Sequence, residues 1–281
     1  MQIAVVGAAS FIATALRKRE ETRTWRFLSH DQAISNDMWL KGTDGVLNCA
    51  FDDRLKSIPY DPNLDIDFHL AQKLANFPGV RYVMLSSRLV YGPAPVDGKL
   101  TEHLPPMPVS VYGKAKLITE MSLERILGNR LTILRLANIF GEEDRPGRQN
   151  FIAVAMRNLQ EKDQIFFDMS PFVRRDFLPV ESLVDSLIRI LVKPTPGLFN
   201  LGSGCGTEVG KIALWLIKGF GRGSLLVTDV RDHDAYWLDI EKAGSAFDLE
   251  PVPESKIQES CLRLGADLSA RIRGKGLVQC A

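Results

Sequence analysis

Short apolar runs alternate with amphipathic segments through the first half of the chain. The apolar runs predict strands at residues 2–6, 24–30, 44–51, 80–87 and 130–141. Helical periodicity or composition predicts helices between them, at residues 11–21, 65–77 and 113–127. Strands that alternate with helices in this way are typical of an α/β fold with a doubly wound parallel sheet.

The pattern loosens after residue 140. Polar residues with Gly and Pro fill residues 141–150, and further elements are predicted at 151–160 (helix), 174–191 (strand, then helix), 197–204 (strand and turn), 207–221 (helix) and 235–247 (helical region). Residues 265–281 have a poor pattern and are expected to be only partly ordered. We therefore predict a core of residues 1–140 and a smaller lobe of residues 141–281, from which residues about 176–202 return to the core.

Composition narrows the classes of protein that fit. The 281 residues are 45% hydrophobic and 25% charged, which is ordinary for a globular protein. The 35 basic and 34 acidic residues nearly cancel, so nothing indicates nucleic acid or a membrane surface as a partner. The four cysteines are scattered and predict free thiols, with no disulfide frame and no metal site (Cys49, Cys205, Cys261 and Cys280).

Targeting signals are also missing from the pattern. No apolar run approaches the ~20 residues that a membrane helix needs. The N-terminal residues MQIAVVGAAS lack a basic region and a cleavage site, so they do not resemble a signal peptide. A cytoplasmic location is therefore expected.

A tight turn follows the first predicted strand. Gly7 ends that strand, and Ser10 and Ala13 stand where further glycines would be expected in a dinucleotide-binding turn. The helix after the turn presents free N–H groups and a positive dipole end, which suit a pyrophosphate. The segment therefore indicates a Rossmann-type dinucleotide site, and an ordinary strand–helix turn is the competing interpretation.

Tyr112 and Lys116 lie one helical turn apart at the start of a predicted helix. Residues four apart share a helix face, so the phenol and the ammonium can point into one space. A neighbouring cation favours the phenolate form, which makes a tyrosine usable as an acid or base. The same spacing also occurs by chance on surface helices, so other segments have to decide between the two interpretations.

Eight segments together resemble the extended short-chain dehydrogenase/reductase family, in particular its nucleotide-sugar epimerases, dehydratases and ketoreductases. They are VVGAASFIATAL, DGVLNCAF, YVMLSSRLVYG, SVYGKAKLITE, LRLANIFG, RRDFLPVESLVDSL, GLFNLGSG and AYWLDIEKA. The segments follow the family's order and roughly its spacing from residue 3 to about residue 250. The joint match favours catalytic roles for Tyr112 and Lys116, a dinucleotide-binding core and a substrate-binding C-terminal lobe.

The resemblance implies a catalytic trio of Ser87, Tyr112 and Lys116. Tyr112 would be the general acid/base, Lys116 would hold the nicotinamide ribose hydroxyls, and Ser87 would bind the substrate oxygen that gains or loses the proton. The implied cofactor site consists of Gly7, Ser10, Phe11, Ile12, Ser29, His30, Ala50, Tyr112 and Lys116.

The end of the second strand bears on the choice of cofactor. An NAD site usually has an acidic residue there, to hold the adenosine ribose. Here Ser29 and His30 occupy the end of the strand and Asp31 comes slightly late. Hydroxyl and imidazole donors suit a 2′-phosphate, so NADP is favoured over NAD. The competing interpretation makes His30 an exposed loop residue.

By the same resemblance, Asn138 and Arg175 would bind the phosphates of a nucleotide-sugar substrate. Arg231 lies two residues from the position of another phosphate-binding arginine in the family. A guanidinium fork matches phosphate oxygens, which explains the residue type. For each arginine, a solvated surface charge is the alternative.

Two departures from the family pattern limit the activity. The 4,6-dehydratases carry an acidic pair directly after the catalytic Ser/Thr, where this chain has Arg88 and Leu89, so dehydration is not expected. The short connection between the second and third strands resembles the dTDP-4-dehydrorhamnose reductase branch, whereas DAYWLDIEKA resembles the 4-epimerases. Reductase and epimerase therefore both stay open.

The sequence thus predicts an NAD(P)-dependent 4-ketoreductase or 4-epimerase of a nucleotide-linked sugar, for which a homodimer is a compatible assembly. A protein of the same fold that binds the dinucleotide as a regulator and catalyses nothing is the alternative. Such sensors typically lack the Tyr/Lys pair, which this chain keeps.

Overall fold

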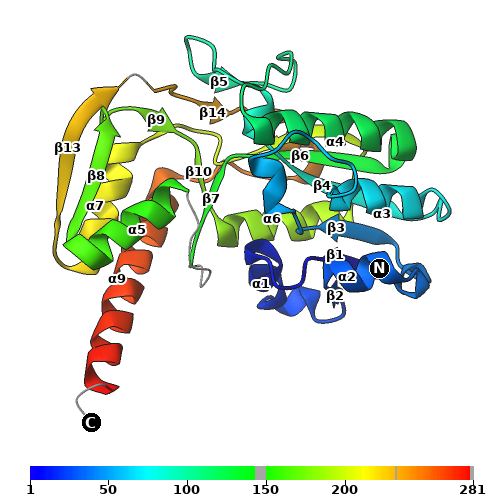
Figure 1. The fold of residues 1–281 in the computed structure, drawn as a ribbon, viewed down its shortest axis with the longest axis horizontal. Coiled ribbons are helices and arrows are strands. Elements are labelled where there is room, and N and C mark those ends of the chain that lie inside the picture. Colours follow the sequence, from blue (N-terminus) through cyan, green and yellow to red (C-terminus); the bar gives the residue numbers. More distant parts are fainter. Residues whose placement is uncertain (143–149, 232, 279–281) are drawn as a thin grey trace.

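A six-stranded parallel sheet forms the centre of the larger part of the molecule (Figure 1). The computed structural model describes residues 1–142, 150–231 and 233–278. The sheet order is β11-β6-β4-β3-β1-β2, and every neighbouring pair is parallel. The strands are β1 (Ile3–Val6), β2 (Arg26–Leu28), β3 (Gly45–Asn48), β4 (Arg81–Ser87), β6 (Leu131–Leu136) and β11 (Gly197–Leu201). The predicted doubly wound parallel sheet is confirmed.

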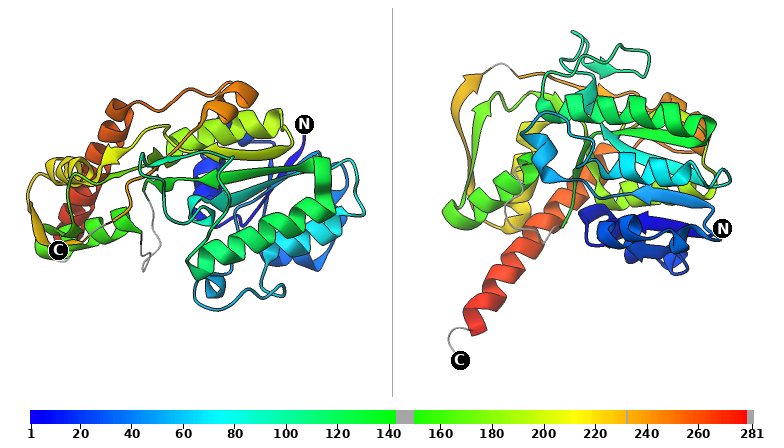
Figure 2. Two further views of the ribbon diagram at one scale, coloured as in Figure 1. Left: turned by 90° about the horizontal axis from the view of Figure 1, so that it is seen from above. Right: turned by 45° about the vertical axis from the view of Figure 1, so that its right-hand side comes forward.

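Helices cover both faces of this sheet (Figure 2). One face carries α1 (Phe11–Arg17), α6 (Val180–Val192) and α8 (Glu241–Phe247), and the other carries α2 (His30–Ser35), α3 (Ile66–Leu74) and α4 (Val111–Leu127). Successive strand residues point to opposite faces. Ile3 and Val5 therefore pack with α1 and α6, while Ala4 and Val6 pack with α3 and α4. Burial on both faces explains why the inner strands are mostly apolar.

The connection from β2 to β3 contains only α2 and a 3-10 turn. Both β2 and β3 lie beside β1, so the chain winds outward in opposite directions from β1. In sheets of this kind, ligands bind beyond the carboxyl ends of the strands at the point where the winding reverses. That point lies between β1 and β3.

The smaller lobe has an apolar core of its own. It contains α5 (Phe151–Lys162), β8 (Gln164–Met169), α7 (Val209–Phe220), β13 (Ser224–Arg231) and α9 (Glu254–Val278), which lie together in Figure 1. β8 and β13 form a separate parallel pair. Helices α7 and α9 pack closely at Gly219. A Cβ at this position would lie 2.0 Å from the Leu262 carbonyl oxygen, so the close approach requires glycine.

Short elements complete the described chain. The remaining strands pair as β7 (Asn138–Phe140) with β10 (Phe177–Pro179), β9 (Arg174–Arg175) with β12 (Thr207–Glu208), and β14 (Trp237–Leu238) with β5 (Lys99–Leu100). The 3-10 turns are η1 (Glu20–Thr22), η2 (Met38–Leu40), η3 (Asp53–Lys56), η4 (Arg88–Val90) and η5 (Gly128–Arg130).

The structure differs from the sequence prediction mainly after residue 140. The region predicted as helical from 235 to 247 begins with β14, and its helix starts only at Glu241. Of the residues expected to be only partly ordered, 265–281, those up to Val278 belong to α9, and residues 279–281 lie outside the described residues. Strands β8 and β13 were not predicted. Most of the predicted polar loop, residues 143–149, lies outside the described residues.

Within the three described ranges, no helix combines the length and the apolar character that crossing a bilayer requires. Over the same ranges, His, Cys, Asp and Glu side chains nowhere gather in a group of three or more that could hold a metal ion.

Candidate active site

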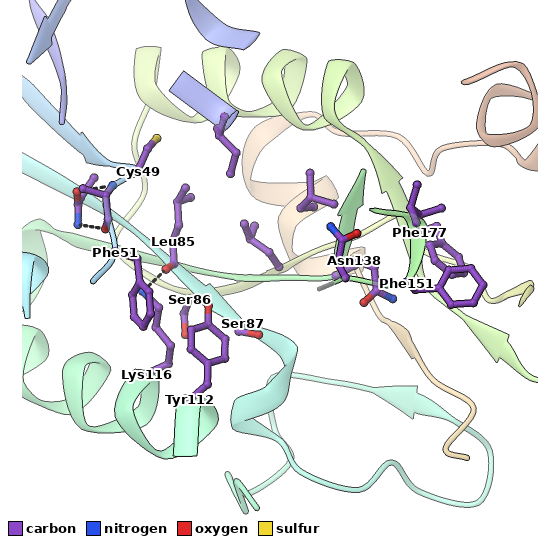
Figure 3. A pocket seen from close by; sticks show the side chains of 18 residues that line it. Cys49, Phe51, Leu85, Ser86, Ser87, Tyr112, Lys116, Asn138, Phe151 and Phe177 are labelled. Carbon is purple, nitrogen blue, oxygen red and sulfur yellow. Dashed lines mark hydrogen bonds between the residues drawn. The ribbon is translucent and has the colours of Figure 1, made fainter. Parts of the chain in front are cut away.

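A pocket of about 290 Å³ lies beyond the carboxyl ends of β3, β4 and β6 (Figure 3). Its volume is near the lower limit of small-molecule sites. Several predicted site residues line it together: Ile12, Ala50, Ser87, Tyr112, Lys116 and Asn138. These residues come from α1, the segment after β3, β4, α4 and β7, so the fold gathers them from distant parts of the sequence.

Ser86 and Ser87 at the end of β4 have different surroundings. The buried Ser86 hydroxyl donates to Glu120, which is itself paired with Arg135 (Oε2–Nη2 2.7 Å). Ser87 is half-buried, and its oxygen accepts from the Leu89 N–H at 3.2 Å. The Ser87 hydrogen is donated to no described residue, so this hydroxyl is the one that can serve a ligand.

Helix α4 is held against the turn after Ser87. Ser110 caps the helix by accepting from the Gly113 N–H at 3.0 Å. A Cβ at Gly113 would lie 2.4 Å from the Leu89 carbonyl oxygen, so the absence of a side chain permits the close approach. The Tyr112 ring meets Phe51 edge-on, with ring centres 5.1 Å apart. Tyr112 and Ser87 thereby line the same pocket.

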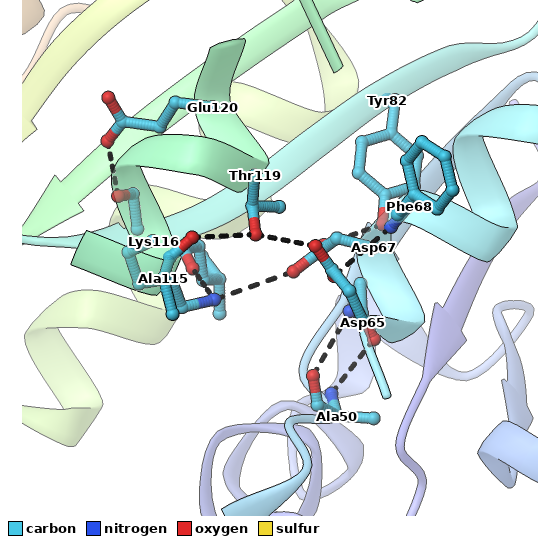
Figure 4. A network of polar contacts seen from close by, with 12 residues as sticks. Ala50, Asp65, Asp67, Phe68, Tyr82, Ala115, Lys116, Thr119 and Glu120 are labelled. Atoms are coloured by element: carbon cyan, nitrogen blue, oxygen red, sulfur yellow. Dashed lines mark hydrogen bonds and ion pairs between the residues drawn. The ribbon is translucent and has the colours of Figure 1, made fainter. Parts of the chain in front are cut away.

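The Lys116 ammonium is buried in a network of protein groups (Figure 4). It donates to the Leu85 carbonyl oxygen at 2.9 Å and pairs with Asp67 at 3.4 Å. Asp67, on α3, also accepts from the Tyr82 hydroxyl at 2.7 Å. The Nζ of Lys116 lies 4.9 Å from the centre of the Phe51 ring. Two of the three N–H donors of Lys116 are therefore used, and one is left for a ligand.

Asp67 keeps the buried ammonium charged. Burial is the largest single influence and lowers the pKa of Lys116, but the charge and hydrogen bond of Asp67, together with the charges of Tyr112 and Asp65, outweigh it, and the pKa is raised above its ordinary value. Burial raises the pKa of Asp67, and Lys116 opposes that shift. Cys49 also lines the pocket, where burial raises the pKa of its thiol to about 12, so this cysteine is a poor nucleophile at neutral pH.

The turn after β1 has a clear requirement for glycine. Gly7 has a φ of +85°, and a Cβ there would lie 2.6 Å from the Ala50 backbone nitrogen. Ser10 caps α1 by accepting from the Ala13 N–H at 3.2 Å, and Ala13 is fully buried. The small residues in this turn therefore bring the start of α1 close to the segment after β3.

The remaining predicted cofactor residues are not part of the lining of this pocket. Ser29 caps α2, where its oxygen accepts from the Gln32 N–H at 3.1 Å. The His30 side chain is 52% exposed, with its Nε2 3.2 Å from Asp31. Phe11, on α1, packs against the sheet cluster that contains α6. Gly7, Ser10, Phe11, Ser29 and His30 do not line the pocket that contains Tyr112.

The predicted substrate residues are placed in three different settings. Asn138 lines the pocket, and its amide nitrogen donates to the Asp176 carbonyl oxygen (2.7 Å) and the Tyr236 hydroxyl (2.5 Å), which leaves no N–H for a phosphate in this arrangement. Arg175 is half-buried, and its Nε has no hydrogen-bond partner among the described residues. Arg231 is exposed on β13 and pairs with Asp229 (Nε–O 3.0 Å), so the structure does not bring it to the pocket.

Sequence reasoning missed four residues that shape the site: Asp67, Phe51, Arg88 and Tyr236. Asp67 carries the one available signal, because an acidic residue within a helical apolar pattern has to find a buried partner or face water. The other three depend on tertiary contacts that no local pattern indicates. Tyr236 is buried, and the guanidinium carbon of Arg88 lies 3.7 Å from the centre of its ring.

Comparison with known proteins gives a family and a fold. The sequence model of the NAD dependent epimerase/dehydratase family matches residues 3–202, which confirms the resemblance seen in the motifs. The chain is 29% identical over 157 residues to dTDP-L-rhamnose 4-epimerase of Burkholderia thailandensis, a match that covers 52% of this chain and 38% of that protein. The chain spans a similar share, 37%, of two curated Arabidopsis thaliana relatives.

Two solved structures share the fold over nearly their whole length. RMD from Pseudomonas aeruginosa, complexed with NADPH, superposes with a TM-score of 0.79 at 18% identity, covering 96% of this chain and 98% of that one. The dTDP-glucose 4,6-dehydratase of Bacillus anthracis, in complex with NAD, gives 0.76 at 20% identity, covering 93% and 95%. Both forms of the dinucleotide therefore occur among proteins of this fold.

Proposed function

The chain belongs to the NAD dependent epimerase/dehydratase family, and we propose that it is an NAD(P)-dependent 4-ketoreductase or 4-epimerase of a nucleotide-linked sugar. The observation that carries this proposal is the convergence of Ser87, Tyr112 and Lys116 on one pocket. That pocket lies beside the point where the winding of the sheet reverses, which is where such folds bind ligands.

The three side chains can divide the proton chemistry between them. Moving a hydride to or from a carbon requires a matching proton at its oxygen. The Tyr112 phenol would exchange that proton, and the unused hydrogen of the Ser87 hydroxyl would bind the same oxygen. The remaining N–H of Lys116 would hold a ribose hydroxyl of the dinucleotide, since its other two are used by Leu85 and Asp67.

The residues around β1 fit a dinucleotide. Gly7 keeps the turn free of side-chain atoms, and the start of α1 would face the pyrophosphate. When bound, the dinucleotide would donate or accept the hydride. Ser29 and His30 at the end of β2 would face the 2′-phosphate of NADP, which we favour over NAD. Asp31, which would hold an unphosphorylated ribose, is directed to His30 instead.

The substrate would lie between the core and the smaller lobe. We assign dinucleotide binding to residues 1–140 and substrate binding mainly to residues 141–281, with Arg175 as a ligand of the substrate's phosphates. Asn138 is a weaker candidate for that role, because both of its amide hydrogens are used within the protein. Dehydration is not proposed, because Arg88 and Leu89 follow Ser87 and neither can transfer the proton that elimination needs.

The test is turnover by a Tyr112→Phe variant. Phenylalanine keeps the ring against Phe51 and removes only the hydroxyl, so NADPH binding should stay within about twofold while turnover of any accepted 4-keto or 4-hydroxy nucleotide sugar falls by roughly 10²–10⁴-fold. Net oxidation of NADPH would identify a reductase, and recycling of the cofactor would identify an epimerase. A variant that keeps more than about half of the wild-type rate would remove Tyr112 from the chemistry.

The same protein tests the cofactor and the alternative function. Titration of wild-type protein with NADPH and NADH should give the lower Kd for NADPH, and a lower Kd for NADH would move attention from His30 to Asp31. Binding of the dinucleotide without turnover of any nucleotide sugar would favour a regulatory protein.

A further inference from the structure

Arg88 is a cation held next to the proposed catalytic serine. It is the first residue of η4, directly after Ser87, and it is half-buried. Its guanidinium carbon lies 3.7 Å from the centre of the Tyr236 ring, which is the geometry of a cation–π contact. Among the residues that the structure describes, no carboxylate lies within ion-pair distance (4.0 Å) of Arg88.

Arg175, from a segment distant from Arg88 in the sequence, contacts the same tyrosine through its backbone. Its backbone forms a bridge with Tyr236, and the Tyr236 N–H donates to the Arg174 carbonyl oxygen at 2.9 Å. Burial lowers the pKa of Arg175, and the neighbouring charge of Arg88 acts in the same direction. Tyr236 and, less strongly, Asp234 and Asp168 oppose the shift, but neither carboxylate forms an ion pair with Arg175 in the described chain. Asp168 instead faces Arg231 and His233.

Arg88 stacks on the ring of Tyr236 and Arg175 bridges to its backbone, so two half-buried arginines meet at one residue. Their like charges repel, and an anion bound by both would be stabilised. Tyr236 connects this pair to the pocket, because its hydroxyl accepts from Asn138, a residue of the pocket wall. The arginine that the sequence offered as a second phosphate ligand, Arg231, is exposed and paired with Asp229. Arg88 therefore takes the place of Arg231 as the second candidate arginine, and it is joined to the pocket wall through Tyr236 and Asn138 and does not itself line the pocket.

We propose that Arg88 is a substrate-binding residue that, together with Arg175, binds an oxyanion of the nucleotide sugar. The proposal rests on the function proposed above and adds a residue that determines which substrates bind. A guanidinium recognises the oxygens of a diphosphate and of a sugar carboxylate by the same charged hydrogen bonds, so both are sources of the oxyanion. Because Arg88 directly follows Ser87, the anion would lie within reach of an arginine side chain from the reacting carbon.

The experiment is calorimetric titration of the NADPH-bound protein with UDP, UDP-glucose and UDP-glucuronic acid, and with their thymidine counterparts. Within each series, the first ligand has only the diphosphate, the second adds glucose, and the third adds a carboxylate to that sugar. The variants are Arg88→Gln and Arg88→Lys. Arg222→Gln is the matched control, because Arg222 also lies over an aromatic ring (4.9 Å from the centre of Phe220) but is exposed in the smaller lobe.

The expected result is a loss of affinity of about tenfold or more in Arg88→Gln, partial recovery in Arg88→Lys, and wild-type affinity in Arg222→Gln. Equal losses for all three ligands would identify the diphosphate as the oxyanion. A loss confined to the glucuronic acid ligand would identify the carboxylate. Unchanged NADPH affinity and Tm in Arg88→Gln would separate ligand binding from a structural role of the stacked side chain.

Wild-type affinity of Arg88→Gln for every ligand would overturn the proposal for Arg88 and leave the proposed function standing. A loss of ligand affinity in Arg88→Gln that comes with a lower Tm and an equally large fold-loss of NADPH affinity would also overturn it, because Arg88 would then only support the position of Tyr236. If the wild-type protein binds none of these uridine and thymidine ligands, the role of Arg88 in binding them is overturned, and the proposed function is then decided separately by turnover in wild type and Tyr112→Phe.

Discussion

Replacing Asp67 by Asn removes the counter-charge of Lys116 while changing little else. Asparagine has nearly the same volume, and its oxygen can still accept from the Tyr82 hydroxyl. The side chains of Lys116 and Asp67 are only 6% and 4% exposed. Breaking such a buried pair from one side typically costs about 3–5 kcal/mol, because the remaining charge stays buried without a partner. We expect a loss of about 3 kcal/mol in the free energy of unfolding at pH 7.

The pH dependence of this loss has a definite sign. In the wild-type protein the pKa of Lys116 is raised above 10.5, so the stabilisation by the pair is complete below pH about 10.5 and is lost as the pH rises through the folded-state pKa. In Asp67→Asn the main opposing charge is gone, and burial should lower the pKa of Lys116 below its unfolded value. The variant then becomes more stable relative to wild type as the pH rises, so the difference between the two should shrink above pH about 10.

Urea unfolding followed by tryptophan fluorescence suits this test, because Trp39 packs in the same apolar cluster as Leu70 and Leu74 of α3. The control is Glu254→Gln, which removes one charge of the half-exposed pair with Lys211 and should cost less than about 1 kcal/mol. The double variant Asp67→Asn/Lys116→Met should recover much of the loss. A loss below about 1 kcal/mol in Asp67→Asn, or one that stays constant from pH 7 to 11, would refute the reasoning.

Two further predictions concern the turn after β1 and the pair of serines. A Cβ at Gly7 would lie 2.6 Å from the Ala50 nitrogen, so Gly7→Ala should weaken NADPH binding by about tenfold or more in a fluorescence titration, and unchanged binding would argue against a dinucleotide at this turn. Ser87→Ala should lower kcat by roughly 10²-fold without loss of stability. Ser86→Ala should instead cost about 1–3 kcal/mol of stability, because the buried Glu120 loses a donor, and the reverse pattern would make Ser86 the catalytic hydroxyl.

The sheet could be predicted from the sequence because its inner strands are buried on both faces and therefore mostly apolar. The elements that were missed lack that signal. Strand β13 is exposed along most of its length, and among the described strands it pairs only with β8, sixty residues earlier by register (Ser224 with Gln164). Helix α9 contains Gly265, which weakens a helix prediction. In the folded protein that glycine is required, since a Cβ there would lie 2.3 Å from the Leu216 carbonyl oxygen of α7.

In the candidate site, too, local relations could be predicted from the sequence and tertiary contacts could not. Tyr112 and Lys116 could be found because their relation is local, one turn of α4. Asp67 could not be assigned to Lys116, because the pair forms only when α3 and α4 pack side by side on the sheet. Phe51, in the segment after β3, contacts both Tyr112 and Lys116, which is likewise a tertiary relation.

Arg175 and Arg231 were both proposed from their spacing along the chain, and the structure places them in different surroundings. Arg175 precedes Asp176, which is fully buried and accepts from the Ser203 N–H (2.8 Å) and the Leu238 N–H (3.0 Å). These bonds fix the backbone beside Tyr236 and therefore the position of the Arg175 Cα, from which its side chain extends. Arg231 has no such anchor, because it ends an exposed strand whose register with β8 shifts between Val227 and Arg231. The position of a residue therefore follows from its spacing best where buried hydrogen bonds set the register, as they do beside Arg175, and least where the strand is exposed and its register shifts, as at Arg231.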